Sequence, residues 1–478
     1  MSFNKSLFFI LFSLSASGQE NLTFSNDLFS GINSAPFSPT QPFFNENSWD
    51  VNLFSESINV ENDYAYISNK SFLSLRNGSI QTADIRNNVR GSNTAGVLDF
   101  YNKDLGNFYF NSDILGPSFS LKQNIKGKVF QLGIYSRLRT QGSALKVDNY
   151  FRFGNQGLQD PDFYDLKPFD MKVVNWGEIG FNMATELFPY AAQKWVVGAN
   201  FKYEIGLDAV DVKSFDVVKL KQTFVEENGA QKQTISAENY NLETNFATNY
   251  NFDSRRYELK QNGKGFGLDL GISMLDKDEN ADNYNFKASF SVLDLGKINF
   301  KGQKNVFKGN NFVIVNNPDL DNSEFISPQQ YLEFLSNLVY GDKNVSLQGT
   351  DFTVGLPTSL HLNLSKNITG NQYLNFDIIQ RSPVFENSLK RSNVFTSSYT
   401  VQKNFVGYGG SVSLYEYKKL QFGGYLRLGP LILGSSNFFP LIFKQKKLNS
   451  GDFFIGLKIY PFWDNEFKRH RRADCNCE

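Results

Sequence analysis

The stretch Lys194–Asp208, which reads KWVVGANFKYEIGLD, decides the fold class of this chain. Its odd positions, from Trp195 to Leu207, are all apolar, whereas most of its even positions are small, polar or charged. Side chains of a β-strand point alternately to opposite faces, so the stretch predicts a strand with one apolar and one polar face. It is long enough to cross a bilayer as a tilted β-strand, for which about 9–11 residues suffice.

The same two-residue period recurs in other segments, and in each the polar face is rich in Gly, Ser and Asn. These segments are 178–187, 265–274, 351–365 and 453–460. A soluble β-sandwich would bury its apolar faces between two sheets and carry bulky polar residues outside. Small polar residues instead suit the concave interior of a barrel whose apolar face meets lipid. We predict an all-β, transmembrane antiparallel barrel, with a large secreted β-sandwich or solenoid as the alternative.

Composition and charge narrow the class of protein further. The 478 residues include 48 Phe, and aromatic residues make up 15% of the chain. After residue 18, no apolar run reaches the roughly 18–20 residues of a membrane-spanning helix. The 48 Lys and Arg balance the 48 Asp and Glu, so nothing indicates a nucleic-acid partner. A helical-bundle membrane protein is excluded.

The N-terminal residues have the features of a secretory signal peptide. Lys5 precedes the apolar run 7–12, and Ala16-Ser17-Gly18 supplies small residues before a cleavage site ahead of Gln19. We therefore divide the chain into a signal peptide (1–18), an N-terminal plug or lead-in segment (19–48), an outer-membrane barrel (49–463) and a polar periplasmic tail (464–478).

Counting strands back from the C-terminus predicts about fourteen, an even number that places both chain ends in the periplasm. Long outer loops are expected at 141–171, 210–262, 303–350 and 381–402. Two interruptions of the alternation, Leu293-Asp294-Leu295 and Gly429-Pro430-Leu431, predict a bulge or a barrel rim. The strands are expected at 49–59, 63–73, 95–102, 113–123, 129–140, 172–188, 194–208, 263–275, 284–300, 351–365, 372–380, 403–415, 420–438 and 451–463.

Charged residues on the polar faces are the candidate lumen-facing residues. Both signs occur, so no filter for ions of one sign is expected, and the charges either brace the barrel by pairing or contact a plug. The candidates are Arg137, Arg139, Glu178, Glu186, Lys202, Glu204, Asp208, Asp269, Lys287, His361, Asp377, Arg427 and Lys458.

Catalytic and cofactor motifs are missing from the sequence. It contains no Gly-x-Ser-x-Gly, no His-Glu-x-x-His and no phosphate loop. We therefore expect a non-enzymatic protein with no catalytic, cofactor-binding or metal residues and no cofactor. The tail holds the chain's 2 cysteines, Cys475 and Cys477, as incidental thiols or as a metal or intermolecular disulfide site.

Two further segments are expected to close the barrel. The proline- and phenylalanine-containing stretch 19–48 shows no alternation and is either a plug or a periplasmic lead-in. Within the loop 303–350, Ser327 and Pro328 have the pattern of a helix N-cap and first position, and Gly341 can end that helix. We expect this short helix to lie over or in the barrel mouth.

Several short segments carry a resemblance to known proteins: 30–33, 49–54, 293–298, 356–360, 429–434 and 452–458. With these, the chain resembles a Bacteroidota outer-membrane β-barrel family of unknown function, architecturally related to FadL-type fatty-acid transporter barrels. Related barrels often carry Asn-Pro-Ala near the start, whereas this chain has SAPFSP at 34–39. The resemblance implies an outer-membrane location and brings no catalytic residue with it.

Two functions follow from these expectations. In the first, the barrel binds or passes a small solute, hydrophobic solutes included, and touches outer-membrane lipid. In the second, it is a structural or assembly barrel that docks cell-envelope or secretion-system proteins.

Overall fold

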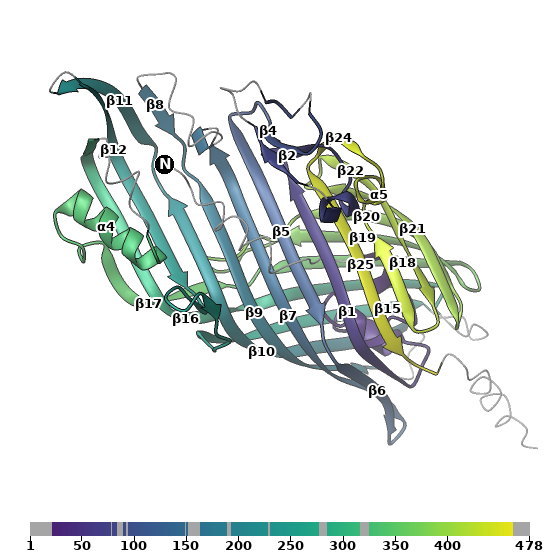
Figure 1. The fold of residues 1–478 in the computed structure, drawn as a ribbon. Helices are drawn as coiled ribbons and strands as arrows, with labels where there is room; N and C mark the ends of the chain where they lie inside the picture. Colours follow the sequence, from purple (N-terminus) through teal and green to yellow (C-terminus); the bar gives the residue numbers. More distant parts are fainter. Residues whose placement is uncertain are drawn as a thin grey trace, which may run out of the picture.

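The computed structural model describes residues 22–77, 79–83, 89–91, 94–148, 150–151, 163–188, 193–227, 230–276, 284–315 and 325–461. The main feature is one antiparallel sheet that closes on itself, because β1 (Trp49–Asn62) pairs with β25 (Ser450–Ile459) (Figure 1). Fourteen strands form the closed barrel. In chain order they are β1, β5 (Leu105–Leu115) continued by β6 (Ser118–Ile125), β7 (Lys128–Asp148), β9 (Asp170–Glu186), β10 (Gln193–Ser214), β15 (Gly263–Asp276), β16 (Phe286–Val315), β17 (Leu347–Gly355) continued by β18 (Ser359–Thr369), β19 (Gln372–Arg381), β20 (Val394–Gln402), β21 (Val406–Tyr415), β22 (Lys419–Leu428), β23 (Leu431–Ser435) and β25.

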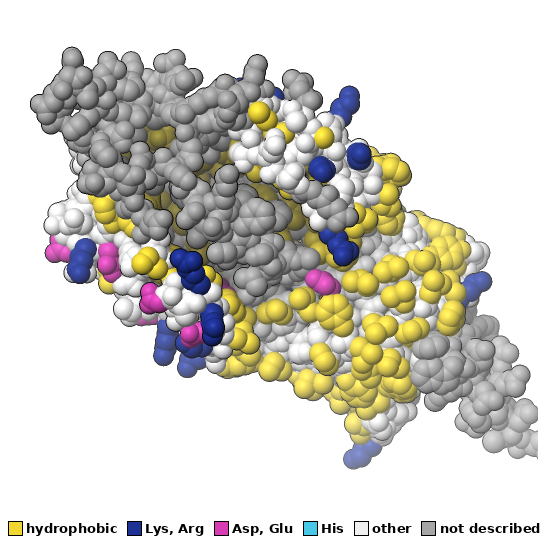
Figure 2. All heavy atoms as spheres, in the orientation of Figure 1, with side chains coloured by type: hydrophobic (Ala, Val, Ile, Leu, Met, Phe, Trp, Pro, Cys, Tyr) yellow, Lys and Arg dark blue, Asp and Glu magenta, His cyan; other side chains and the backbone are white. Residues whose placement is uncertain are grey.

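The apolar face of the strands points out of the barrel. Ile134, Phe201 and Phe266 are 55%, 54% and 75% exposed, whereas their polar neighbours Asn200 and Lys202 are buried. Figure 2 shows apolar side chains over much of the barrel surface in view. The prediction of an all-β antiparallel barrel is therefore confirmed, and the sandwich alternative is wrong because these apolar rows are not enclosed between layers.

The number of strands was predicted correctly, but four of the assignments behind it are wrong. The segments 63–73 and 95–102 contain β2 (Ala65–Lys70) and β4 (Val97–Phe100), which form a separate four-stranded sheet with β3 (Gln81–Thr82) and β24 (Gln445–Leu448). In compensation, 420–438 holds two barrel strands and the expected loop 381–402 contains β20. The two strands within 420–438, β22 and β23, are joined by a turn at Gly429, whose φ is 53°. The predicted barrel rim at this position is therefore confirmed. The strand β20 escaped detection because its residues Ser397 and Ser398 weaken the alternation.

Several strands continue beyond the barrel at one end. The outer parts of β10 and β16 pair with β12 (Ala230–Ala247), which in turn pairs with β11 (Val218–Glu227), and β11 pairs with β8 (Phe163–Leu166). The expected loops 210–262 and 303–350 are thus partly strand, an outcome that propensity alone did not indicate. Short elements nearby are β13 (Tyr250–Asn251), β14 (Arg256–Tyr257), η3 (Leu73–Asn77) and α5 (Phe438–Ile442).

The helix expected near residue 328 is confirmed as α4 (Pro328–Tyr340). The Ser327 side chain accepts a hydrogen bond from the Gln330 N–H at 3.2 Å, and Gly341 ends the helix in the left-handed conformation. Tyr340 stacks on Phe307 of β16, with 6.3 Å between ring centroids. The helix therefore packs beside the strand extension (Figure 1).

The predicted signal peptide (1–18) and the predicted periplasmic tail (464–478), with Cys475 and Cys477, lie outside the described residues. Among the residues that are described, no helix has the length and apolar character needed to cross a bilayer.

Candidate functional site in the barrel interior

Residues 22–48, which we call the plug segment, lie inside the barrel and are almost entirely buried. The segment contains three short helical turns, α2 (Leu22–Ser25), η1 (Gly31–Ser34) and η2 (Gln41–Phe44). Its apolar side chains pack on the inner wall, for example Phe24 against Tyr425 and Ile32 in a cluster with Leu115 and Tyr135. The interior is therefore filled by the chain's own N-terminal residues.

Wall side chains satisfy the backbone and polar groups of the plug segment. Asn200 donates to the Ala35 carbonyl at 2.8 Å, and Asn182 donates to the Pro39 carbonyl at 2.9 Å. Thr40 lies 2.6 Å from the Ser273 hydroxyl. Buried backbone groups need such partners, so the amides and hydroxyls that the strands turn inward hold an irregular segment that could not otherwise be buried.

Two buried ion pairs hold the first part of the plug segment and the start of β1. Arg427 lies 3.2 Å from Asp27, and Tyr425 donates to the same carboxylate at 2.6 Å. Lys458 lies 2.5 Å from Asp50 and donates to the Ser30 carbonyl at 2.5 Å. All four charged groups are fully enclosed, so each would be strongly destabilised without its partner.

A second contact region involves His361 of β18 and Lys287 of β16. His361 Nδ1 lies 2.7 Å from the Phe37 carbonyl oxygen, and Nε2 lies 3.0 Å from the Asp377 carboxylate. Lys287 donates to the Gln41 side chain at 2.5 Å, with the Phe44 and Tyr284 rings 5.3 and 5.5 Å from its ammonium. Both side chains thus connect the barrel wall directly to the plug segment.

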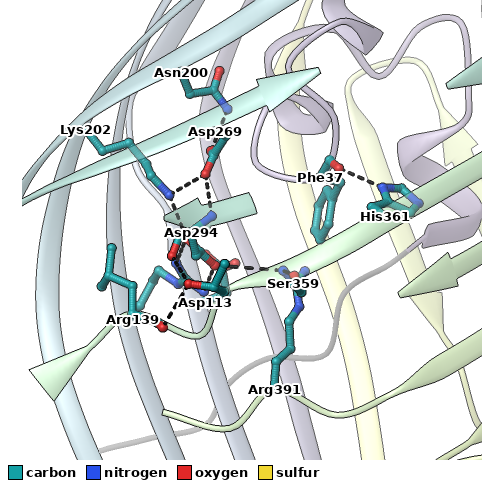
Figure 3. Close-up of polar contacts among 12 residues, drawn as sticks. Phe37, Asp113, Arg139, Asn200, Lys202, Asp269, Asp294, Ser359, His361 and Arg391 are labelled. Atoms are coloured by element: carbon teal, nitrogen blue, oxygen red, sulfur yellow. Dashed lines mark hydrogen bonds and ion pairs between the residues drawn. The ribbon is translucent and has the colours of Figure 1, made fainter. Parts of the chain in front are cut away.

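An ionic cluster occupies the wall beside the plug segment, with Asp294 at its centre (Figure 3). Arg139 contacts the Asp294 carboxylate with distances of 2.8 and 3.1 Å, and Lys202 lies 2.5 Å from it. Lys202 also lies 2.8 Å from Asp269. The Asp294 N–H donates to Asp269 at 2.6 Å, which links the two carboxylates through the backbone.

The bulge expected at Leu293-Asp294 is confirmed and explains this position. The register between β15 and β16 shifts between Leu268 and Leu270, and Asp294 has φ 57°. Strict alternation would point Asp294 out of the barrel, and the extra residue of the bulge turns its carboxylate into the interior.

One buried carboxylate of the cluster makes no hydrogen bond to the part of the chain that the structure describes. Register places Arg137, Glu178, Glu204 and Gly265 side by side across four strands. Arg137 pairs with Asp113 and lies 3.5 Å from Glu178. Neither carboxylate oxygen of Glu204 has a hydrogen-bond partner among the described residues, although the side chain is buried.

Twelve of the thirteen lumen-facing candidates are buried. They are Arg137, Arg139, Glu178, Glu186, Lys202, Glu204, Asp269, Lys287, His361, Asp377, Arg427 and Lys458. The structure brings Arg137, Arg139, Glu178, Lys202, Glu204 and Asp269 into one cluster. Other candidates contact the plug segment or β1 at separate places: His361 with Asp377, Arg427, Lys458 and Lys287. Glu186 belongs to neither group and pairs with Lys194.

The inward orientation expected for Asp208 is wrong. The pairing of β10 with β9 shifts between Gly206 and Asp208, so the alternation reverses beyond this bulge. Asp208 then lies opposite Asn175, and it accepts hydrogen bonds from the Tyr257 hydroxyl at 2.5 Å and the Asn249 N–H at 2.6 Å. The residue belongs to the β13–β14 hairpin contact rather than to the lumen.

Sequence reasoning missed several interior charges, above all Asp27, Asp50, Asp113, Asp294 and Arg391. Asp50 and Asp113 lie on predicted strands and could have been found by extending the period-two assignment to 49–59 and 113–123. Asp27 and Arg391 lie in irregular segments, for which no periodicity assigns a direction.

The arrangement fills much of the barrel interior with the plug segment and paired charges. In the described part of the chain, no group of three His, Cys, Asp or Glu residues could hold a metal ion. Most of the interior charges, Glu204 excepted, form salt bridges with one another or contact the plug segment, so they brace the wall and position that segment.

Comparison with known proteins places the chain among related sequences. The solved structures include a similar one, a Pseudomonas aeruginosa FadL homologue, with 8% sequence identity and a TM-score of 0.23 over 92% of this chain and 96% of that one. No curated protein matches the chain. A family model matches residues 42–436, which is most of the chain. The chain therefore belongs to the family of unknown function DUF5723.

Proposed function

We propose that this chain is an exported outer-membrane barrel, non-enzymatic, that binds or passes a small solute and is closed by the plug segment. The observation that carries the proposal is the burial of residues 22–48 inside a closed barrel with an apolar outer face. Closure supports a membrane location, because an open sheet edge in hydrocarbon would leave backbone groups unpaired at several kcal/mol each.

The polar contacts between the plug segment and the barrel wall support the proposal that this segment can move. The contacts of Asn182, Asn200 and Lys287 with the plug segment are hydrogen bonds, which water can replace if the segment moves. A permanently sealed core would have no need for so many polar groups, since apolar packing fills space at lower desolvation cost.

A reversible crosslink tests this proposal. Ser38 and Ser291 have their hydroxyl oxygens 3.5 Å apart, so Ser38→Cys with Ser291→Cys can join plug to wall. Cys475→Ser and Cys477→Ser remove the natural thiols. In planar bilayers we expect step conductances that rise when this disulfide is reduced, and the single-cysteine variants serve as controls. Equal silence of the oxidised, reduced and 19–48-deleted forms would contradict a gated solute path.

A second candidate is a structural or assembly barrel that docks cell-envelope or secretion-system proteins. The sheet extension of β8, β11 and β12 with α4 favours it, because these elements lie beyond the strands that close the barrel. Extraction in mild detergent distinguishes the two: a stoichiometric co-purifying protein, lost when residues 218–247 are replaced by a short turn, supports docking.

A further inference from the structure

A small chamber lies inside the barrel on one side of the plug segment. Leu22 and Thr23, the first described residues, line it on the plug side. On the wall, Asn59, Asn111 and Gln141 are register neighbours on β1, β5 and β7. Thr396, Ser413 and the segment 390–392 also line it, together with the side chains of Tyr109, Phe110, Val394 and Tyr415.

Two acceptors in this wall have no donor among the described residues. The side-chain carbonyl oxygens of Asn111 and Gln141 are buried and make no hydrogen bond to the described residues. A buried polar atom left without a partner is destabilising, so such atoms usually meet water or a ligand. Because the two residues are direct neighbours across β5 and β7, their oxygens present paired acceptors to whatever fills the chamber.

Charge in the lining is positive only. Lys390 and Arg391 line the chamber, and none of the described carboxylates does. Arg391 is engaged by the Ser359 hydroxyl at 2.7 Å. Burial lowers the pKa of Lys390, which lies in the connection between β19 and β20. The lining therefore offers acceptors and hydroxyls without a carboxylate that could hold a metal cation.

Size and polarity restrict the occupant. The centre of a water molecule can move through about 40 Å³ of this space, and one ordered water needs roughly 10–15 Å³ of such volume. The chamber holds a few waters or one compact solute. A long acyl chain is too large for this volume, and amides and hydroxyls from five strands offer hydrogen bonds to a polar occupant.

We propose that this chamber is a binding site for a small hydroxylated solute of the monosaccharide or polyol class. The solute's hydroxyls donate to the Asn111 and Gln141 oxygens. Its own oxygens accept from Lys390 and from the one hydroxyl proton that the hydrogen bond between Thr396 and Ser413 leaves free. The inference rests on the proposed function, since it names the solute of the same barrel, and it replaces a hydrophobic solute by a polar one.

Binding in detergent tests the site without requiring transport. The full chain, folded in detergent, is titrated with glucose and with glycerol by calorimetry, with oleate as the apolar probe. We expect saturable heat with glucose or glycerol and none attributable to the chamber with oleate. Asn111→Leu with Gln141→Leu should weaken the affinity at least about tenfold, as expected for lost hydrogen bonds to a buried ligand.

Matched controls keep the result interpretable. Gln123→Leu changes an exposed glutamine of β6 and should leave binding unchanged. Thr396→Val, on the opposite wall, provides a milder variant if the double substitution prevents folding. Absence of saturable binding by both hydroxylated probes, or binding unaffected by the chamber variants, would show that the space holds water only. Binding without conductance would contradict the proposed solute path but not the binding site. Conductance without binding would contradict the binding site but not the solute path.

Discussion

Asp27 of the plug segment lies 3.2 Å from Arg427 of β22, and both side chains are wholly buried although 400 positions separate them in the chain. Removing one partner of such a pair leaves an uncompensated charge, which costs about 3–5 kcal/mol. Arg427→Leu should therefore lower the free energy of unfolding by that amount and expose residues 22–48 to protease. Urea titration and limited proteolysis measure both effects.

The control for this prediction is an exposed ion pair. Lys103 lies 3.3 Å from Asp63, with side chains 52% and 46% exposed. Lys103→Leu should change stability by no more than about 1 kcal/mol. Equal effects of the two substitutions would show that the Asp27–Arg427 pair does not anchor the plug segment.

Substitution of an outward-facing leucine tests whether the apolar outer surface of the barrel faces lipid. Leu270 is 47% exposed in the middle of β15, and Leu259 is 75% exposed in a connection outside the barrel strands. Arginine near the centre of a bilayer costs about 2–4 kcal/mol, so Leu270→Arg should reduce assembly into membranes whereas Leu259→Arg should not. Heat-dependent gel migration of membrane fractions reports folded barrel. Tolerance of both changes would argue for a water-exposed outer face.

Gly180 must be a glycine because Tyr135 of the neighbouring strand lies across it. A Cβ added at Gly180 would stand 2.1 Å from the Tyr135 ring, whereas the nearest atom to a Cβ at Gly177 is 3.7 Å away. Gly180→Ala should destabilise by about 1–3 kcal/mol and Gly177→Ala by much less.

A double-mutant cycle separates this contact from a general loss of glycine flexibility. In a Tyr135→Ala background, Gly180→Ala should cost little, which gives a coupling of about 0.5–3 kcal/mol. Additive effects of the two substitutions, measured by denaturant unfolding, would reject the contact as the cause.

The cluster around Asp294 contains one carboxylate more than it has cations. Arg137, Arg139, Lys202 and Arg391 make four cations, against five carboxylates of Asp113, Glu178, Glu204, Asp269 and Asp294. Glu204→Gln removes the unpartnered one at constant shape and should leave stability unchanged or raise it by about 1–3 kcal/mol. Glu178→Gln, which breaks contacts to Arg137 and Arg139, should destabilise instead. A large loss of thermal stability in Glu204→Gln would indicate an undetected partner.

The sequence predicted the strands whose alternation is long and regular. In β10 and β15, outward apolar residues such as Phe201 and Phe266 alternate with inward residues such as Asn200 and Gly267. In each strand the alternation continues over a length greater than one bilayer crossing needs. At Gly429-Pro430 the alternation is interrupted, but the interruption was interpreted as a bulge or rim within one strand, and it is the turn between β22 and β23. Period two gives the face of a residue but not the point at which the chain reverses.

Interior charges on regular strands could be predicted, but those at irregularities could not. Lys202 and Asp269 follow directly from alternation, whereas Asp208 was misplaced by a bulge and Asp294 was brought inside by another. A bulge shifts every following side chain to the other face, and its register depends on pairing with a distant strand.

Alternation by itself determined that this chain forms long amphipathic strands with apolar residues on one face, because that periodicity is local. Only the tertiary structure decided which strands pair, where the barrel closes and that residues 22–48 occupy its interior. Those outcomes depend on contacts such as Asp27 with Arg427 and Asn200 with Ala35, which lie 400 and 165 positions apart. Contacts over such separations arise from the closed shape of the sheet and leave no local pattern in the sequence.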